Sequence, residues 1–188
     1  MSSERSFDSL LGAMRHGASL LHEHRIDFAL AGSLAVYARG GPESDHDVDF
    51  VLKPDDVDRA LTIFGENGWR CERPPEGWLV KVYDDQEAMI DLIFEPNYTP
   101  VDDQLLSRAD ELEVYAVKLK VMSVTDVLAT KLLALKEHEV DYESVLEVAR
   151  ACREQVDWPV LRDRTSHSPY AKAFFTIAEG LGLTPKRP

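Results

Sequence analysis

The spacing of apolar positions changes along the chain, and this change predicts the order of the elements. Apolar residues between Phe7 and His24 recur at helical spacing, which predicts an amphipathic first helix. The short apolar run Phe28 to Ala31 predicts a strand, and Gly32-Ser33 predicts a turn before a short helix, Leu34 to Arg39. The chain therefore begins with a helix, a strand, a Gly-Ser turn and a second helix.

The middle of the chain shows the short apolar runs and the alternation that are typical of strands. One helix interrupts them, opened by a proline near its first position. The polar segment Asp84 to Glu87 joins two of the runs and predicts a hairpin. The predicted strands are Asp47 to Leu52, Trp78 to Tyr83, Ala88 to Phe94 and one or two strands within Glu113 to Val121, and the helix is Pro54 to Asn67.

The last third of the chain follows a helical pattern. The predicted helices are Thr125 to Glu137 with Ser123 as N-cap, Tyr142 to Glu154, and Tyr170 to Leu181, with a break at Trp158-Pro159. Strands thus dominate the middle and helices the end. We expect an α+β fold, with a mixed β-sheet flanked by helices in residues 1–122 and a C-terminal helical module, residues 123–188, packed on it.

Composition narrows the function classes. The hydrophobic fraction of 44% suits a folded globular protein, and no apolar run approaches the roughly 18 residues of a membrane span. The first residues lack the apolar stretch of a secretory signal, so we expect a cytoplasmic protein without membrane contact. Cys71 and Cys152 fit neither a disulfide framework nor a zinc motif. The formal net charge of −13 excludes a broad basic surface, so any contact with nucleic acid must be local.

Acidic residues interrupt two of the predicted strands. Asp47 and Asp49 are two positions apart, so their side chains point to the same side of a strand, where two carboxylates repel unless a cation lies between them. Asp91 interrupts an otherwise apolar strand, and a buried carboxylate requires a partner. Three carboxylates on neighbouring strands can hold two Mg²⁺ ions about 3.5 to 4 Å apart, which would bind a nucleoside triphosphate.

Each of these residues also has a purely structural interpretation. Two acids at this spacing are frequent by chance, and Asp91 could cap a bulge or pair with Lys81 or Arg39. The Gly32-Ser33 turn favours the chemical interpretation, because backbone amides at such a turn can hold phosphate oxygens.

Together these residues resemble the nucleotidyltransferase superfamily with the DNA polymerase β-like fold. That superfamily carries a Gly-Ser or Gly-Gly turn, an acidic pair on a strand and a third acid on a later strand. Here these are Gly32-Ser33, then Asp47 and Asp49 after a gap of thirteen residues, and Asp91. The helical part after residue 121 is similar to AbiEii-like toxin nucleotidyltransferases and to small drug-modifying nucleotidyltransferases.

The chain departs from this family pattern at two positions. Asp45 stands where relatives often have Ser or Thr, and Glu43 stands where many have Arg. Both add negative charge near the expected metals. An alternative register, in which Asp45 and Asp47 form the pair, remains open, although the thirteen-residue gap favours Asp47 and Asp49.

Two residues of the C-terminal helices are further candidates. Lys131 falls in the middle of the apolar side of its predicted helix, formed by Val127, Leu128, Leu132, Ala134 and Leu135. It could extend along the helix to water, or it could neutralise triphosphate charge, as the lysine that relatives carry in this helix suggests. Asp141 is expected as an N-cap, and the resemblance also permits a catalytic or nucleotide-binding role.

The resemblance implies an Mg²⁺-dependent enzyme that moves a nucleoside monophosphate from a triphosphate to an acceptor hydroxyl. Asp47, Asp49 and Asp91 would bind two metal ions, Gly32 and Ser33 would bind phosphates, and Lys131 would offset their charge. The acceptor could be tRNA or protein, if the chain is the toxin of a toxin-antitoxin pair with an antitoxin partner, or an aminoglycoside-type antibiotic. A third hypothesis is a degenerate domain that only binds a nucleotide or a partner protein.

The two acceptor hypotheses require different surfaces. A tRNA acceptor needs a basic strip, for which Lys81, Lys118, Lys120 and Lys131 are the candidates. A polycationic antibiotic needs acids, and the candidates are Glu43, Asp45, Asp84, Asp85 and Glu87.

Overall fold

The computed structural model describes residues 2–42 and 47–185, which form two compact units. The first unit comprises Met1–Leu34 and Ser44–Met122, and the second comprises Ala35–Glu43 and Ser123–Pro188. The segment Ala35–Glu43 thus groups with the C-terminal helices. The positions Glu43, Asp45 and His46 lie outside the described residues.

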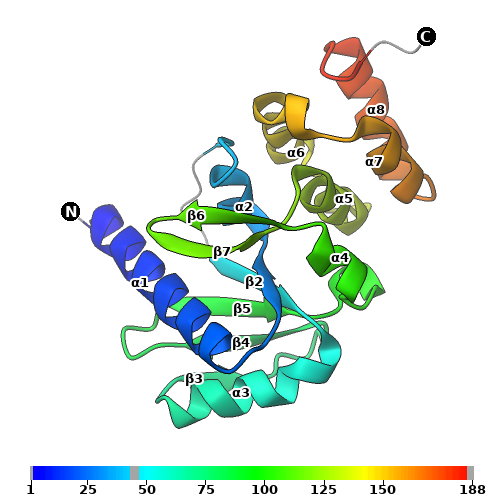
Figure 1. The fold of residues 1–188 in the computed structure, drawn as a ribbon. Helices are drawn as coiled ribbons and strands as arrows, with labels where there is room; N and C mark the ends of the chain where they lie inside the picture. The colour runs from blue at the N-terminus through cyan, green and yellow to red at the C-terminus, as the bar shows by residue number, and fades with distance from the viewer. Residues whose placement is uncertain (1, 43–46, 186–188) are drawn as a thin grey trace. The chain divides into compact units, whose positions relative to one another are not determined.

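The first unit contains one mixed sheet. Within the described part of the chain, seven strands pair in the order β3-β4-β5-β2-β1-β7-β6 (Figure 1). Two neighbouring pairs, β1 with β7 and β2 with β5, are parallel, and the others are antiparallel. The predicted α+β fold is confirmed. The strands are β1 (Phe28–Leu30), β2 (Val48–Leu52), β3 (Arg70–Glu72), β4 (Leu79–Tyr83), β5 (Met89–Ile93), β6 (Asp110–Val114) and β7 (Val117–Val121).

One face of this sheet is apolar and is covered by helices. Val48, Phe50, Ile90 and Leu92 alternate along β2 and β5 and are fully buried. Helix α1 (Ser2–Glu23) runs along this face and also contacts α3 (Val57–Glu66) (Figure 1). A Cβ on Gly17 would lie 2.5 Å from Ile90 Cδ1, so a larger residue here would require the Ile90 side chain to shift.

Short elements complete the first unit. They are the helix α2 (Gly32–Tyr37), which continues into the second unit, the 3₁₀ turns η1 (Pro54–Asp56) and η2 (Pro96–Tyr98), and α4 (Asp103–Ser107). The sequence pattern did not predict β3 or α4. The hairpin over Asp84 to Glu87 is confirmed, because the backbone N–H of Asp84 donates to the Ala88 carbonyl.

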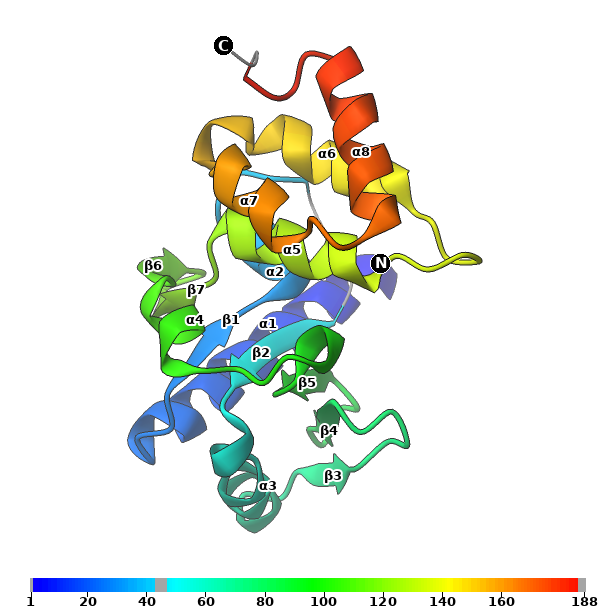
Figure 2. The same ribbon diagram turned by 90° about the vertical axis from the view of Figure 1, so that its right-hand side faces the viewer.

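The second unit is built around α5 (Val124–Ala134). This helix contacts α6 (Tyr142–Ala151), α7 (Trp158–Arg164) and α8 (Pro169–Gly180) (Figure 2). A 3₁₀ turn, η3 (Arg153–Gln155), follows α6. Each of the four helices begins with a capping side chain that accepts a hydrogen bond from the backbone three residues on. The caps are Ser123, Asp141, Asp157 and Ser168.

Several helix boundaries differ from the prediction, and two of the differences have a clear local cause. Helix α5 ends at Ala134 rather than near Glu137, because Leu135 is extended and Lys136 pairs with Glu139 in a small bridge. Trp158-Pro159 begins a helix instead of breaking the chain, since Asp157 caps it and proline is tolerated in a first turn. In the described residues, no helix is both long and apolar enough to cross a membrane.

Candidate active site

Two of the predicted acids lie side by side on neighbouring strands. Asp49 on β2 and Asp91 on β5 are direct partners in the register of the parallel pair. Since Val48, Phe50, Ile90 and Leu92 point to the buried apolar face, both carboxylates point to the opposite face. Strand pairing thus joins two acids that are 42 positions apart in the sequence.

Asp91 is buried and has a cationic partner. Its residue is 8% exposed, and Lys81 Nζ lies 2.8 Å from Oδ1 and 3.1 Å from Oδ2. Lys81 is also the register partner of Asp91 on β4. This confirms the alternative that Asp91 pairs with Lys81.

The charges around Asp91 act in opposite directions. Burial raises the pKa of Asp91 above its ordinary value, the Lys81 ammonium opposes the rise, and the negative charge of Asp47 adds to it. Burial lowers the pKa of Lys81, but its hydrogen bond and charge contact with Asp91 outweigh this, and the net pKa of Lys81 is raised. The site therefore holds a carboxylate whose charge is only partly compensated.

Gly32 lies directly against the Asp49 carboxylate. A Cβ on Gly32 would stand 1.8 Å from Asp49 Oδ2, and the glycine has φ +60°, a conformation that L side chains rarely adopt. The Ala31 N–H also donates to the Asp49 backbone carbonyl at 2.8 Å. The structure therefore brings the predicted Gly-Ser turn and one predicted metal ligand together, with Ser33 next along the chain.

Asp47 is exposed and lies one residue before β2. In the described ranges, no group of three or more His, Cys, Asp or Glu side chains is arranged to hold a metal ion. Asp49 and Asp91 nevertheless fit Mg²⁺, which prefers oxygen ligands and commonly takes one or two carboxylates together with substrate phosphates. The alternative pair of Asp45 with Asp47 depends on a residue outside the described part.

A row of charged side chains extends from the acids to the edge of the sheet. Asp49, Asp91, Lys81 and Glu72 are successive register partners across β2, β5, β4 and β3. Sequence reasoning missed Glu72 because β3 has only three residues, all exposed. The signal for Lys81 was present, since it stands between the buried Val80 and Val82.

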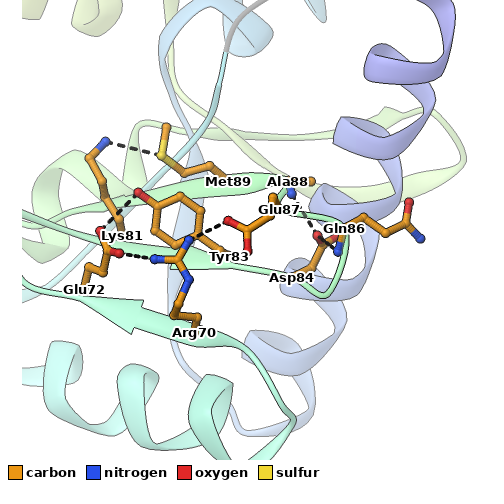
Figure 3. A network of polar contacts seen from close by, with 9 residues as sticks. All are labelled: Arg70, Glu72, Lys81, Tyr83, Asp84, Gln86, Glu87, Ala88 and Met89. Atoms are coloured by element: carbon orange, nitrogen blue, oxygen red, sulfur yellow. Dashed lines mark hydrogen bonds and ion pairs between the residues drawn. The ribbon is translucent and has the colours of Figure 1, made fainter. Parts of the chain in front are cut away.

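Beside Lys81 lies a second polar cluster (Figure 3). The Arg70 guanidinium stacks over the Tyr83 ring at 3.9 Å and pairs with Glu72 and Glu87. The Tyr83 hydroxyl donates to Glu72 at 3.3 Å. Glu72 and Glu87 are thus held by a cation close to Lys81.

Lys131 and Asp141 belong to the second unit. Lys131 is half-buried on α5, beside the buried Val127, Leu128 and Leu132, whereas the predicted apolar position Ala134 is exposed. Asp141 caps α6 and accepts a hydrogen bond from Ser144 N–H at 3.2 Å, so the capping interpretation is confirmed. Hydrogen bonding with Ser144 lowers the pKa of Asp141, and the nearby charge of Lys131 lowers it further.

The residues predicted to bind tRNA and those predicted to bind a cationic antibiotic are arranged differently. Lys81 lies on β4, whereas Lys118 and Lys120 lie on β7, and three strands separate β4 from β7 in the sheet. Lys81 and Lys120 are also engaged, with Asp91 and Asp27 respectively. The first unit therefore does not gather these lysines into one strip.

Acids of the β4–β5 turn instead line a cavity of about 410 Å³ with the first half of α1. Asp84, Asp85 and Asp8 are part of its wall, together with His16. Asp84 also accepts hydrogen bonds from the backbone N–H groups of Gln86 and Ala88. Asp84 and Asp85 thus form one side of a concave surface, whereas Glu87, the third predicted acid of this turn, pairs with Arg70.

A mixed sheet that sets two acids in register, against a tight Gly-Ser turn, is the arrangement that the resemblance to nucleotidyltransferases predicts. The family model described as "Nucleotidyl transferase of unknown function (DUF2204)" matches residues 11–172, and the chain belongs to this family. The predicted resemblance to the nucleotidyltransferase superfamily, and the prediction of an enzyme, are confirmed.

Solved structures have the same fold. One is ANT(2")-Ia in complex with adenylyl-2"-tobramycin, with 12% identity and a TM-score of 0.60; the match covers 89% of this chain and 99% of that chain. Another is the lincomycin-bound lincosamide antibiotic adenylyltransferase LnuA, with 12% identity and a TM-score of 0.51; the match covers 77% of this chain and 93% of that chain. An antigenic nucleotidyltransferase-like protein from Paracoccidioides brasiliensis is also similar, with 15% identity and a TM-score of 0.58; the match covers 96% of this chain and 95% of that chain. No curated protein sequence matches this chain.

Proposed function

We propose that this nucleotidyltransferase moves a nucleoside monophosphate from an Mg²⁺-bound nucleoside triphosphate to a hydroxyl of a small cationic acceptor. The observation that carries the proposal is the register pairing of Asp49 with Asp91, one of them buried, on the polar face of the sheet. Two carboxylates held together at such cost to the fold suit a cation-dependent site.

Asp49 and Asp91, with Asp47 at the start of β2, are the residues that would hold the metal. Magnesium, when bound, neutralises phosphate charge and lowers the pKa of an attacking hydroxyl. Gly32 lets the turn lie directly against the Asp49 carboxylate, and Ser33, next along the chain, would bind phosphate oxygens of the triphosphate. Lys131 and Asp141 remain candidates for nucleotide binding from the second unit.

The chemical step is an in-line displacement at the α-phosphate. The acceptor oxygen forms a bond to the α-phosphorus while the bond to the β-phosphate oxygen breaks, and pyrophosphate leaves. Asp91 would take the proton of the acceptor hydroxyl, because it is the buried carboxylate nearest to Asp49. Holding both reactants in line provides much of the rate enhancement in such reactions.

A small cationic acceptor is favoured over tRNA by the charges of the first unit. The net charge is −13, and Lys81 is separated from Lys118 and Lys120 by three strands of the sheet. Two structures with the same fold are described with antibiotics or their adenylylated forms. These observations support an amino-sugar or similar polyamine alcohol as acceptor.

The test is transfer of label from each of the four α-labelled nucleoside triphosphates, with Mg²⁺, onto aminoglycosides, lincosamides, total tRNA and the protein itself. Asp49→Asn is the inactive variant, and Asp103→Asn, an exposed acid paired with Lys53, is the matched control. We expect label on a small cationic alcohol with wild type and control only. Label on tRNA or protein would show that the acceptor is a macromolecule rather than a small cationic alcohol. No label anywhere with folded protein would favour the degenerate domain: a nucleotide-binding one if Mg²⁺ and triphosphate still raise the melting temperature, and a partner-binding one if they do not.

A further inference from the structure

The Lys81 ammonium occupies the coordinating side of Asp91. Its Nζ is within hydrogen-bonding distance of both carboxylate oxygens, at 2.8 and 3.1 Å. The side chains are 26% and 12% exposed, so this is a partly buried pair rather than a surface contact. Both oxygens that a metal ion would use are therefore already bound to a cation of the chain.

Asp91 stands between opposite charges. Its register partner on β2 is the acid Asp49, and its partner on β4 is the base Lys81. Neighbouring strands are about 4.8 Å apart, so each charge lies within direct reach of Asp91. A divalent cation bridging Asp49 and Asp91 would meet the Lys81 ammonium at the same carboxylate, and two cations on one carboxylate repel.

Lys81 has a second acid on its other side. Glu72 is its register partner on β3, on the same face of the sheet, and is half-exposed. Lys81 Nζ also lies 3.5 Å from Met89 Sδ, beside the cluster that contains Glu72 (Figure 3). The lysine therefore has a carboxylate on this face to which it can turn, one that Arg70 and Tyr83 already contact.

We propose that Lys81 is a positioning residue that serves as the built-in counter-ion of Asp91, holding its carboxylate before the metal binds and yielding it to the metal by turning toward Glu72. This inference rests on the proposed function, because it takes Asp91 to be a metal ligand. It makes Lys81 a competitor of the metal and a determinant of the metal concentration that the enzyme needs.

The test is a titration with Mn²⁺ alone, in which free Mn²⁺ is measured by its electron paramagnetic resonance signal. Lys81→Met removes the charge, Lys81→Gln keeps a hydrogen-bond donor without the charge, and Lys53→Met is the matched control, since Lys53 forms a 2.9 Å pair with Asp103. We expect half-saturation at up to about tenfold lower Mn²⁺ in both Lys81 variants, because a favourable change of 1.4 kcal/mol is tenfold in affinity. The control should match wild type.

Thermal melting gives the second readout. Without metal, Lys81→Met should melt about 3 to 8 °C below wild type, because Asp91 loses its counter-ion. Adding Mn²⁺ should raise the melting temperature of Lys81→Met by more than it raises that of wild type. Lys81→Gln keeps the test decisive if Lys81→Met does not fold. Equal or weaker Mn²⁺ binding in a folded Lys81 variant would overturn the inference alone. Mn²⁺ binding that is absent from wild type, or unchanged in Asp91→Asn, would overturn the proposed function as well.

Discussion

Each unit of the protein contains a buried aspartate paired with a cation, yet the two aspartates have different surroundings. Asp91 in the first unit lies 2.8 Å from Lys81, and Asp126 in the second lies 2.6 Å from Arg164. Asp126 also accepts a hydrogen bond from the Ser123 hydroxyl at 2.6 Å, while its own N–H donates to that hydroxyl. Asp126 is thus part of the reciprocal cap that begins α5.

Asp91 has no such capping role, and its other neighbour across the strands is the acid Asp49. A buried ion pair alone therefore does not distinguish a structural site from a catalytic one. The distinguishing feature is a second acid in register, which places two negative charges side by side.

The largest expected effect separates these two aspartates by activity. Asp91→Asn and Asp49→Asn should each lower kcat/KM for nucleotidyl transfer about 10³-fold, because metal stabilisation of the transition state contributes several kcal/mol. Asp126→Asn should leave kcat/KM per folded molecule within about twofold. The measurement is steady-state transfer, normalised to folded protein. Equal losses in Asp91→Asn and Asp126→Asn would remove the distinction between them.

The second effect separates them by stability. Asp126→Ala should lower the free energy of unfolding by about 3 kcal/mol, since it leaves a partly buried arginine without its acid and removes half of the reciprocal cap. Urea unfolding followed by circular dichroism measures it. A loss of unfolding free energy below about 1 kcal/mol would show that Asp126 contributes no more to stability than a surface ion pair does.

The difference in charge compensation also gives a pH effect. Burial raises the pKa of Asp91 in the folded state, so the folded protein holds that proton more tightly than the unfolded chain. Its contribution to stability therefore falls as pH rises from the ordinary aspartate value through the raised one. Asp91→Asn should gain stability relative to wild type across this window, as seen in unfolding curves collected from pH 3 to 7. If Asp91→Asn instead gained stability relative to wild type as the pH was lowered, this sign would be contradicted.

These contrasts also show what local sequence patterns can establish. The period of two along Asp47 to Leu52 predicts that Asp47 and Asp49 share a face, and Ser123 predicts the start of α5 correctly. The pairing of β2 with β5 was beyond this pattern, because strand order depends on the whole sheet. The pattern also missed β3, whose three exposed residues have no apolar side, and therefore missed Glu72 as a neighbour of Lys81.

The smallest expected effect concerns Asp141. A capping role and a nucleotide-binding role predict different results for two variants of this residue. Asp141→Ser retains a capping oxygen, whereas Asp141→Ala removes it and should cost about 1 kcal/mol of stability. The lowered pKa of Asp141 means that its contribution is present at neutral pH and is lost as pH falls through the lowered value. If Asp141→Ser keeps stability but weakens triphosphate binding, as measured by calorimetry, Asp141 also binds the nucleotide.

The central claim is that Asp49 and Asp91 hold the metal that binds the triphosphate. Crystals of the protein grown with Mn²⁺ and a non-transferable triphosphate analogue test it most directly through the anomalous signal of manganese. The account predicts a manganese peak within about 2.5 Å of carboxylate oxygens of both aspartates, with the phosphates beside Gly32 and Lys81 turned away from Asp91. A bound analogue whose manganese contacts neither aspartate would contradict it.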